Sequence, residues 1–368
     1  METEELITLL GEVTAAFDQK QFFEARGLQR SVQKEVEKVI SCRQHGKPAA
    51  GNQGIRASAI ILSHVDDDLI GDALSRVALQ VEGDFEIILV SNGNENLEQK
   101  GRECLKRFRF VDIPINSGCS IGRNIAANLA KGEWLIFLED DGLIEPGCID
   151  ALLRNVDETG AVMARGRVRS LTVDPKNDPP HYDMGDYRRL SFMNCEGVSC
   201  VRREDFCLFD GFDPVLAGSE GIELCARMWR FYGPRGFQYE PDAVLLHDFA
   251  SSKDQARVKL KGQARHAAYV DAVTPNARGL HKLMLDAKNL PESEAAVYAL
   301  EAMTASGRNQ KTNPKISVIT TAKDGEGWLE DYLISWTRQT YENYEVVFVD
   351  DGSHDNSLAV MQQVARKD

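Results

Sequence analysis

From residue 56 onward the chain alternates short apolar runs with amphipathic segments, and this alternation limits the possible folds more than any other feature. The runs are "SAIILS", "FEIILVS", "RFVDIP" and "WLIFLE", and the segments 68–81, 96–108 and 120–131 between them have helical spacing. Continuous apolar runs separated by helices are typical of a parallel sheet that is covered by helices on both faces. The predicted fold class is therefore α/β, with a mostly parallel sheet and flanking helices.

The composition is that of an ordinary globular protein and argues against several function classes. The 368 residues are 43% hydrophobic and 27% charged, with a net charge of −14. A general nucleic-acid binder needs a basic face, so we expect no nucleic-acid partner. We also expect no transmembrane segment, because no apolar run approaches the roughly 18–20 residues that a span requires. Eight scattered cysteines without a CxxC pair predict reduced thiols in a cytoplasmic protein, with the inner face of the membrane as the alternative location.

The ends of the alternating region differ from it in pattern. Residues 1–45 have helical periodicity, and "RQHGKPAAGNQG" then breaks it, so we predict a helical N-terminal appendage and linker over residues 1–50. This appendage is a candidate surface for homo-oligomerisation or for membrane-surface docking, and its sequence does not decide between them. The main domain is predicted over residues 56–255, and a helical bridge over residues 256–312.

The spacing of the first two apolar runs recurs near the end of the sequence. Ser58 lies 27 positions before Phe85, and Ser317 lies 27 positions before Tyr344. Each first run reads as a strand, and each second run leads into a glycine-containing turn. We therefore predict that residues 314–368 are the incomplete start of a second domain of the same type, in a chain cut from a longer protein. The alternative is an accessory βαβ unit that docks on the first domain.

Three consecutive carboxylates follow the last of the four apolar runs, in "IFLEDDGLIEPG". Glu139, Asp140 and Asp141 repel one another and resist desolvation, so a cation or a solvated surface must relieve them. Parallel α/β sheets bind ligands at the carboxyl ends of their strands. The acidic cluster is therefore predicted to lie at the ligand edge of the sheet. The alternative is an acidic turn that caps the helix near Pro146.

Three longer stretches resemble those of a known enzyme family. "NSGCSIGRNIAANLAKGEWLIFLEDD" is similar to the donor-site signature of the family 2 glycosyltransferases, and "VDDGSHDNS" to the signature at the end of their second strand. "GFDPVLAGSEGIELCARMW" resembles their acceptor-side segment. The resemblance covers residues 56–255 and again 314–368. It implies a Rossmann-like GT-A transferase domain over residues 56–255 and the opening of a second one over residues 314–368.

In this resemblance the acidic cluster corresponds to the DxD element of the family. The resemblance implies that Asp141 is a metal ligand and that Glu139 and Asp140 are on the donor side, with Glu139 as the ribose-side or the outer-sphere partner. It makes His247, in "AVLLHDF", a further metal ligand that a later strand brings back; a polar cap is the other interpretation of this histidine. The implied cation is Mn²⁺ or Mg²⁺, which would act as a Lewis acid on the leaving diphosphate.

The resemblance also implies a nucleotide site. Arg123 opens a helix after "NSGCSIG" and is expected near the donor phosphates, with a surface salt bridge as the alternative. Asn92 stands where the family has an aspartate that reads the uracil ring, and its amide has both a donor and an acceptor for a base edge. Ser63 and His64 are expected to flank the same pocket. Asp351 is the equivalent of Asn92 in the second copy.

The acceptor-side segment departs most from the family pattern. Inverting transferases need a general base, which the family takes from a Glu-Asp pair. Here Glu220 is followed by Gly221, and Glu223 lies one helical turn away, so Glu220 or Glu223 is the candidate base, with Glu220 preferred. Residues 171–187 are predicted to form a lid or an ordinary surface loop. Three aromatic residues are candidates for stacking on a sugar or for core packing: Trp229, Phe231 and Tyr232.

Together these features predict a metal-dependent inverting glycosyltransferase. It would move a hexosyl or N-acetylhexosaminyl group from a nucleotide-diphosphate sugar, expected to be a UDP-sugar, to a hydroxyl of a glycan acceptor in polysaccharide or glycoconjugate biosynthesis. The alternative is a non-catalytic nucleotide-sugar- or glycan-binding module that positions a second transferase domain. Gly221 and Asn92 are the features that favour this module.

Overall fold

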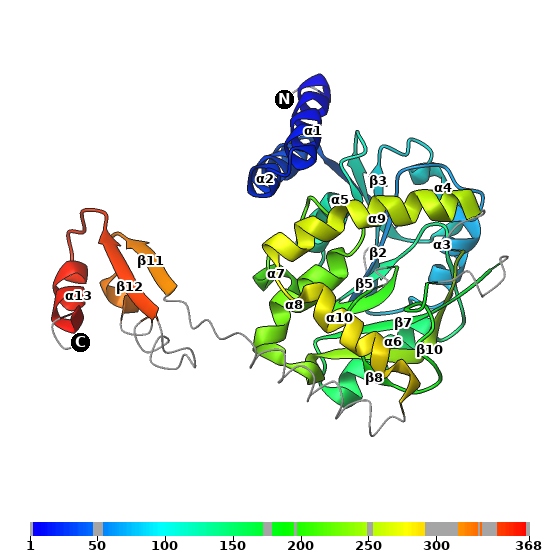
Figure 1. Ribbon diagram of the computed structural model, residues 1–368. Coiled ribbons are helices and arrows are strands. Elements are labelled where there is room, and N and C mark those ends of the chain that lie inside the picture. The colour runs from blue at the N-terminus through cyan, green and yellow to red at the C-terminus, as the bar shows by residue number, and fades with distance from the viewer. Residues whose placement is uncertain are drawn as a thin grey trace. The chain divides into compact units, whose positions relative to one another are not determined.

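The computed structural model divides the chain into two compact units, residues 1–303 and residues 304–368. Each unit has a sheet of its own (Figure 1). The structure describes residues 3–46, 54–171, 179–194, 197–248, 253–290, 316–329, 332 and 344–365.

The first unit is built around a ten-stranded sheet. Its strands are β1 (Ser41–His45), β2 (Ala57–Ser63), β3 (Phe85–Asn92), β4 (Phe108–Ile113), β5 (Trp134–Leu138), β6 (Leu143–Ile144), β7 (Met163–Arg169), β8 (Arg189–Leu190), β9 (Val198–Arg202) and β10 (Phe237–Leu246). Their order is β1-β4-β3-β2-β5-β9-β7-β10-β6, and β8 pairs with β10. The four apolar runs of the sequence form the adjacent strands β4, β3, β2 and β5, as the alternating pattern predicts.

Helices cover both faces of this sheet (Figure 1). The helices of this unit are α1 (Thr3–Asp18), α2 (Phe22–Val39), α3 (Ile70–Ala78), α4 (Leu97–Cys104), α5 (Cys119–Leu129), α6 (Cys148–Thr159), α7 (Arg203–Leu208), α8 (Glu220–Tyr232), α9 (Lys253–Val273) and α10 (Ala277–Asp286). In the described part of the chain, no helix is both long and apolar enough to pass through a bilayer.

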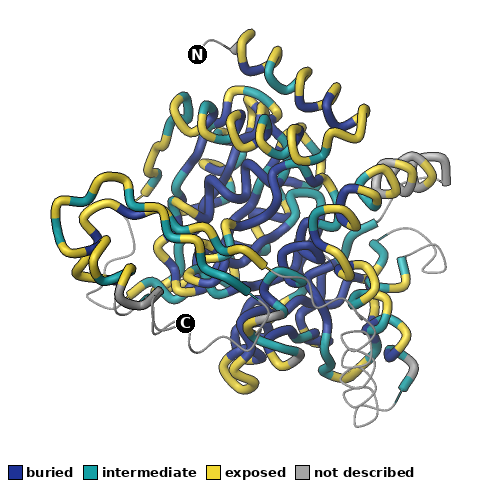
Figure 2. The backbone as a smooth tube through the Cα atoms, turned by 60° about the vertical axis from the view of Figure 1, so that its left-hand side comes forward, coloured by how far each residue is buried: buried dark blue, intermediate teal, exposed yellow. Residues whose placement is uncertain are grey.

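The central strands have apolar side chains on both faces, and these form two separate core clusters. In β2, Ile60 belongs to the cluster under α5 and α8, whereas Ile61 belongs to the cluster under α3 and α6. In β5, Phe137 belongs to the cluster under α5 and α8, and Ile136 belongs to the cluster under α3 and α6. Neighbouring side chains of a strand point to opposite faces, so a strand covered on both sides must be apolar throughout. Figure 2 shows the inner strands of the sheet as buried backbone.

The predicted α/β fold with helices on both faces of the sheet is confirmed, and within it the sheet contains both parallel and antiparallel strand pairs. The strands β4, β3, β2 and β5 are parallel, and so are β7 and β10. In contrast, β9 runs antiparallel to both β5 and β7, and β1 runs antiparallel to β4. The antiparallel start of β9 lies beside the end of β5, where the acidic cluster is.

The N-terminal helices α1 and α2 pack on the rest of the first unit. Val32 and Val36 of α2 are fully buried in the same core cluster as α5 and α8. The Arg26 Nε atom lies 2.9 Å from the Asp213 Oδ2 atom in the acceptor-side segment. The apolar side of these helices is therefore buried against the rest of the first unit.

The prediction of a helix over residues 1–45 is wrong at its C-terminal end. Residues 41–45, "SCRQH", form β1, which pairs antiparallel with β4 at the edge of the sheet. This strand is mostly exposed and has no alternation of apolar and polar residues, so periodicity could not have identified it.

The described part of the predicted helical bridge belongs to the first unit. Tyr269 and Val270 of α9 and Met284 of α10 are buried in the core cluster of that unit. The Tyr269 hydroxyl donates a 2.7 Å hydrogen bond to Asp213. Residues 291–312 lie outside the described residues.

The second unit contains the strands β11 (Ile316–Ala322) and β12 (Tyr344–Asp350) and the helix α13 (Ser357–Ala365). The two strands are parallel, and Ser317 pairs with Glu345 just as Ser58 pairs with Glu86 in the first unit. In both pairs the serine hydroxyl donates a 2.6 Å hydrogen bond to the glutamate. The two halves of the sequence repeat therefore have the same strand register.

Candidate active site

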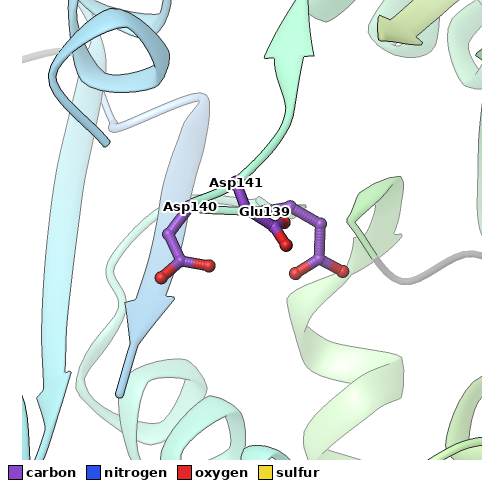
Figure 3. Close-up of side chains that lie close together, drawn as sticks. All are labelled: Glu139, Asp140 and Asp141. Atoms are coloured by element: carbon purple, nitrogen blue, oxygen red, sulfur yellow. The ribbon is translucent and has the colours of Figure 1, made fainter. Parts of the chain in front are cut away.

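The acidic cluster lies in the turn that follows β5. One carboxylate oxygen each of Glu139, Asp140 and Asp141 lies within 4.8 Å of the other two, and the three side chains point to the same side of the turn (Figure 3). Burial raises the pKa of Asp140 to about 7, a hydrogen bond from Ser63 opposes this rise, and the charges of Glu139 and Asp141 add to it. Three carboxylates at this spacing suit a divalent cation with oxygen ligands.

Strand pairing brings His247 to the acidic cluster. Residue Leu246, at the end of β10, pairs antiparallel with Leu143 of β6, which begins directly after the acidic turn. The His247 Nε2 atom consequently lies 3.4 Å from the Asp141 Oδ1 atom. An imidazole nitrogen next to carboxylates is a donor set that suits Mn²⁺ and is acceptable for Mg²⁺. The two residues predicted as metal ligands are thus adjacent.

One part of the predicted lid packs against this site. Residues 172–178 lie outside the described residues, but Tyr182 and Met184 in the following segment are buried. The Tyr182 hydroxyl lies 3.5 Å from the His247 Nδ1 atom. The described half of the loop is therefore a packed wall beside His247.

Arg123 connects the acidic cluster to the acceptor-side segment. Its Nη2 atom lies 3.3 Å from the Glu139 Oε1 atom, and its Nη1 atom lies 3.2 Å from the Glu220 Oε1 atom. The side chains of Arg123 and Glu220 are only 8% and 3% exposed, whereas that of Glu139 is 28% exposed. The guanidinium group is a buried link between two carboxylates, not the surface salt bridge of the alternative interpretation.

Helix α5 holds the acceptor-side segment through side chains on its buried face. Asn124 forms a pair of hydrogen bonds with the backbone of Phe212, at 2.8 and 2.9 Å. The Ser120 hydroxyl donates a 2.7 Å hydrogen bond to the carbonyl of Leu216. The Cys119 thiol lies 3.5 Å from Glu220. The helix that supplies Arg123 therefore also fixes the segment that leads to Glu220.

The two candidate bases have different surroundings. Glu220 is the first residue of α8, and it accepts a 2.6 Å hydrogen bond from the backbone N–H of Gly218 as well as its bond from Arg123. Glu223 is fully buried and accepts hydrogen bonds from Arg227 at 2.8–2.9 Å and from Thr274 at 2.6 Å. Glu220 thus shares Arg123 with the acidic cluster, whereas Glu223 binds groups of α8 and of the segment after α9.

A comparison with protein families identifies the family of this chain. The family model described as "Glycosyl transferase family 2" matches residues 58–204 and 317–368, which together are more than half of the 368 residues. This chain belongs to glycosyl transferase family 2. Both halves of the sequence repeat fall in the matched ranges, and so do Arg123 and the acidic cluster.

Relatives and solved structures of this family 2 member share limited similarity with it. An uncharacterized glycosyltransferase of Haemophilus influenzae is 34% identical over 55 residues, and a teichoic acid poly(glycerol phosphate) polymerase of Staphylococcus epidermidis is 24% identical over 159 residues. These matches cover 15% and 41% of this chain but only 17% and 21% of the relatives' lengths.

Two solved structures resemble the chain at lower identity. S. aureus TarS 1–349 in complex with UDP-GlcNAc is 16% identical with a TM-score of 0.46, and the match covers 70% of this chain and 74% of that one. Mannosyltransferase PcManGT from Pyrobaculum calidifontis, in complex with GDP-Man and Mn²⁺, is 14% identical with a TM-score of 0.47. That match covers 91% of this chain and 93% of the other.

The predicted nucleotide residues of this family 2 member lie at the same edge of the sheet. Asn92, at the end of β3, is buried. Its side-chain Oδ1 atom accepts hydrogen bonds from the backbone N–H and the hydroxyl of Ser117 at 2.9 and 3.0 Å. Its amide group donates to Asn116 and to the carbonyl of Gly118. Asn92 therefore fixes the loop before α5, and pairing with a base edge would require these bonds to exchange. Ser63 is buried, and His64 is exposed.

Gly197 contributes to the site and escaped sequence reasoning. A Cβ atom built on this residue would lie 2.1 Å from the Cγ atom of Glu139, so only glycine leaves room for the glutamate side chain. The backbone N–H of Glu139 also donates to the carbonyl of Gly197 at 3.3 Å. An isolated glycine ahead of a strand does not by itself indicate a site residue. Only the antiparallel pairing of β9 with β5 brings Gly197 next to Glu139.

The three candidate aromatic residues differ in their surroundings. The ring of Trp229 stacks on Phe237 with 5.6 Å between centroids. The Tyr232 hydroxyl donates to Asp205, and Phe231 is exposed beside Phe209. Trp229 therefore has the core-packing role.

Proposed function

We propose that this chain transfers a hexosyl or N-acetylhexosaminyl group from a nucleotide-diphosphate sugar to a glycan hydroxyl with inversion at the anomeric carbon. One observation carries the proposal: Arg123 joins the three-carboxylate turn to Glu220, which puts a cation site and a base candidate on either side of one guanidinium group. The expected donor is a UDP-sugar, and membership of family 2 supports the reaction class.

Asp141 and His247 are the proposed ligands of a divalent metal, Mn²⁺ or Mg²⁺. Carboxylate and imidazole donors 3.4 Å apart fit such an ion. When bound there, the metal would supply Lewis-acid stabilisation of the charge on the leaving diphosphate. Glu139 and Asp140 lie next to this position and are proposed to orient the donor.

Glu220 is the proposed general base. Its carboxylate would take the proton of the acceptor hydroxyl as that oxygen bonds to the anomeric carbon, and the bond from this carbon to the diphosphate oxygen would break with its electron pair on the diphosphate. The N–H of Gly218 and the guanidinium of Arg123 hold the carboxylate in one orientation. Arg123 is also proposed to bind the diphosphate, because a guanidinium group suits bidentate contacts with phosphate oxygens.

A non-catalytic binding module is the second candidate. Two observations favour it: Gly221 follows Glu220, and Glu220 is 2% exposed with its oxygens already bonded to Arg123 and Gly218. In this role the site would bind a nucleotide sugar or a glycan and position a second transferase domain. We propose that residues 314–368 begin that domain after the main domain, residues 56–255, and the family match to residues 317–368 supports this.

The proposed setting is the synthesis of a polysaccharide or glycoconjugate. Similarity to a teichoic acid polymerase supports a bacterial surface polymer as the product. The scattered cysteines without a CxxC pair support a cytoplasmic location, where thiols stay reduced.

The deciding experiment measures UDP release from a panel of UDP-sugars, with and without Mn²⁺, for the wild type and for Asp141→Ala. Asp150→Ala, an exposed aspartate of α6, is the matched control. We expect Mn²⁺-dependent turnover that falls at least about a hundredfold in Asp141→Ala and stays unchanged in the control. Turnover that needs no metal and survives Asp141→Ala would refute the metal role. Calorimetric binding of UDP-sugars without any turnover would favour the binding module.

A further inference from the structure

A cavity of about 410 Å³ in the first unit shares the loop of residues 116–118 with Asn92, whereas the acidic cluster, Arg123 and Glu220 are not part of its lining. Its walls come from α1, α2, the loop before α5, the segment before α8, and α9. Small-molecule sites in proteins have volumes of about 300–1,000 Å³, so the cavity is large enough for one ligand of that kind.

Cys119 and the segment before α8 connect this cavity to the base candidate. Gly118 forms part of its wall and precedes Cys119, whose thiol lies 3.5 Å from Glu220. Val215 forms another part and lies in the segment that leads to Glu220. The contacts form a chain that runs from the acidic turn through Arg123, Glu220 and Cys119 to the cavity wall. Along this chain of contacts, a ligand in the cavity would lie nearer to Glu220 than to the acidic turn, and the loop of residues 116–118 would also join it to Asn92.

The lining combines apolar surface with hydrogen-bonding groups. Val13 and Phe17 contribute apolar side chains, and Thr14 and Arg265 contribute polar ones. Gln29 is 6% exposed, and its carboxamide oxygen has no hydrogen-bond partner within the part of the chain that the structure describes. A buried acceptor without a partner is costly unless a ligand or a water satisfies it.

We propose that this cavity binds a sugar unit of the glycan acceptor, so that the N-terminal helices and α9 form one side of the acceptor site. A pyranose has apolar C–H faces and a rim of hydroxyl groups, which matches apolar walls with a free acceptor at Gln29. This inference rests on the proposed function, because it assigns the acceptor of the same reaction. It gives the packing of α1 and α2 on the transferase unit a functional reason.

The test fills the cavity with a large side chain placed on α1. Thr14→Trp introduces a large ring at a position that lines the cavity, and Thr8→Trp is the matched control on the same helix. Both threonines are exposed, and each donates a hydrogen bond to the carbonyl four residues earlier, at 3.0 and 2.9 Å. Gln29→Leu removes the buried acceptor at similar size.

The probes are the p-nitrophenyl β-glycosides of glucose, galactose, N-acetylglucosamine and glucuronic acid. Their binding to the full chain is measured by saturation-transfer NMR without donor, which makes the result independent of turnover. We expect at least one glycoside to bind the wild type and Thr8→Trp equally, and Thr14→Trp at least tenfold more weakly. Gln29→Leu is expected to weaken binding about five- to tenfold, the effect of one lost hydrogen bond.

Three results would overturn the inference: no glycoside binds the wild type, Thr14→Trp binds as well as Thr8→Trp, or UDP displaces the glycoside. The last result would put the nucleotide in the cavity. Failure of the proposed function has a different signature, namely glycoside binding that Thr14→Trp abolishes although no UDP-sugar is turned over. UDP-sugar turnover with an acceptor KM that is unchanged in Thr14→Trp would leave the function intact and exclude only the cavity.

Discussion

Replacing Arg123 should destabilise the first unit strongly, because it would leave a buried carboxylate without its counter-charge. The pair of Arg123 with Glu220 is buried, with side-chain exposures of 8% and 3%. Removing one partner of such a pair costs about 3–5 kcal/mol. The second contact, to Glu139, adds about 0–1 kcal/mol, because that carboxylate is 28% exposed and water screens it.

We therefore expect Arg123→Met to lower the free energy of unfolding by about 3–5 kcal/mol. The measurement is urea unfolding followed by tryptophan fluorescence, in a background with Trp328 and Trp336 replaced by Phe so that the signal comes from Trp134 and Trp229 of the first unit. Activity is not the readout, so the result does not depend on the proposed reaction.

The double variant Arg123→Met/Glu220→Gln tests the cause of this loss. It removes both charges, so at least half of the lost stability should return, since an apolar or neutral replacement of a buried pair is often nearly neutral. A loss below about 1 kcal/mol in Arg123→Met would show that the pair is not the buried link inferred here. A double variant as unstable as the sum of the two single ones would refute the charge argument in the same way.

Two further predictions concern stability and the shape of the site. Gly197→Ala should displace the Glu139 side chain, because the new Cβ atom would lie 2.1 Å from its Cγ atom; a crystal structure with Glu139 unmoved would contradict this. Burial lowers the pKa of His181 to about 3 and that of His281 to about 4, so both stay neutral in the folded chain while the unfolded chain takes up protons below pH 6.5. Stability should therefore fall as the pH drops below 6.5, by about 2 kcal/mol at pH 5 for both together once their partial solvent exposure is allowed for. Urea unfolding of a His181→Gln/His281→Gln variant at pH 7 and pH 5 should show a smaller drop than the wild type, and an equal drop would refute the assignment.

Local patterns predicted most of the central fold. The apolar runs became β2, β3, β4 and β5, and the periodic segments between them became α3, α4 and α5. The same patterns missed β1, because "SCRQH" has no apolar alternation, and they gave no sign that β9 runs antiparallel. An edge strand with both faces exposed needs no apolar pattern, and the direction of a strand depends on the partners beside it.

Part of the site could be predicted and part could not. The position of Glu139, Asp140 and Asp141 followed from their place directly after an apolar run. The choice between Glu220 and Glu223 did not, because both lie in the first turn of α8. The i,i+4 spacing pairs Glu223 with Arg227, but only packing brings Arg123 to Glu220.

The sequence by itself determined that a parallel strand would end in a group of carboxylates, because alternation, periodicity and adjacency along the chain are local properties. Only the tertiary structure decided that His247 meets Asp141, that Arg123 joins the acidic turn to Glu220, and that the N-terminal helices complete the unit. These contacts connect segments that are distant along the chain. They depend on strand register and on which charges are buried together, and no single segment carries that information.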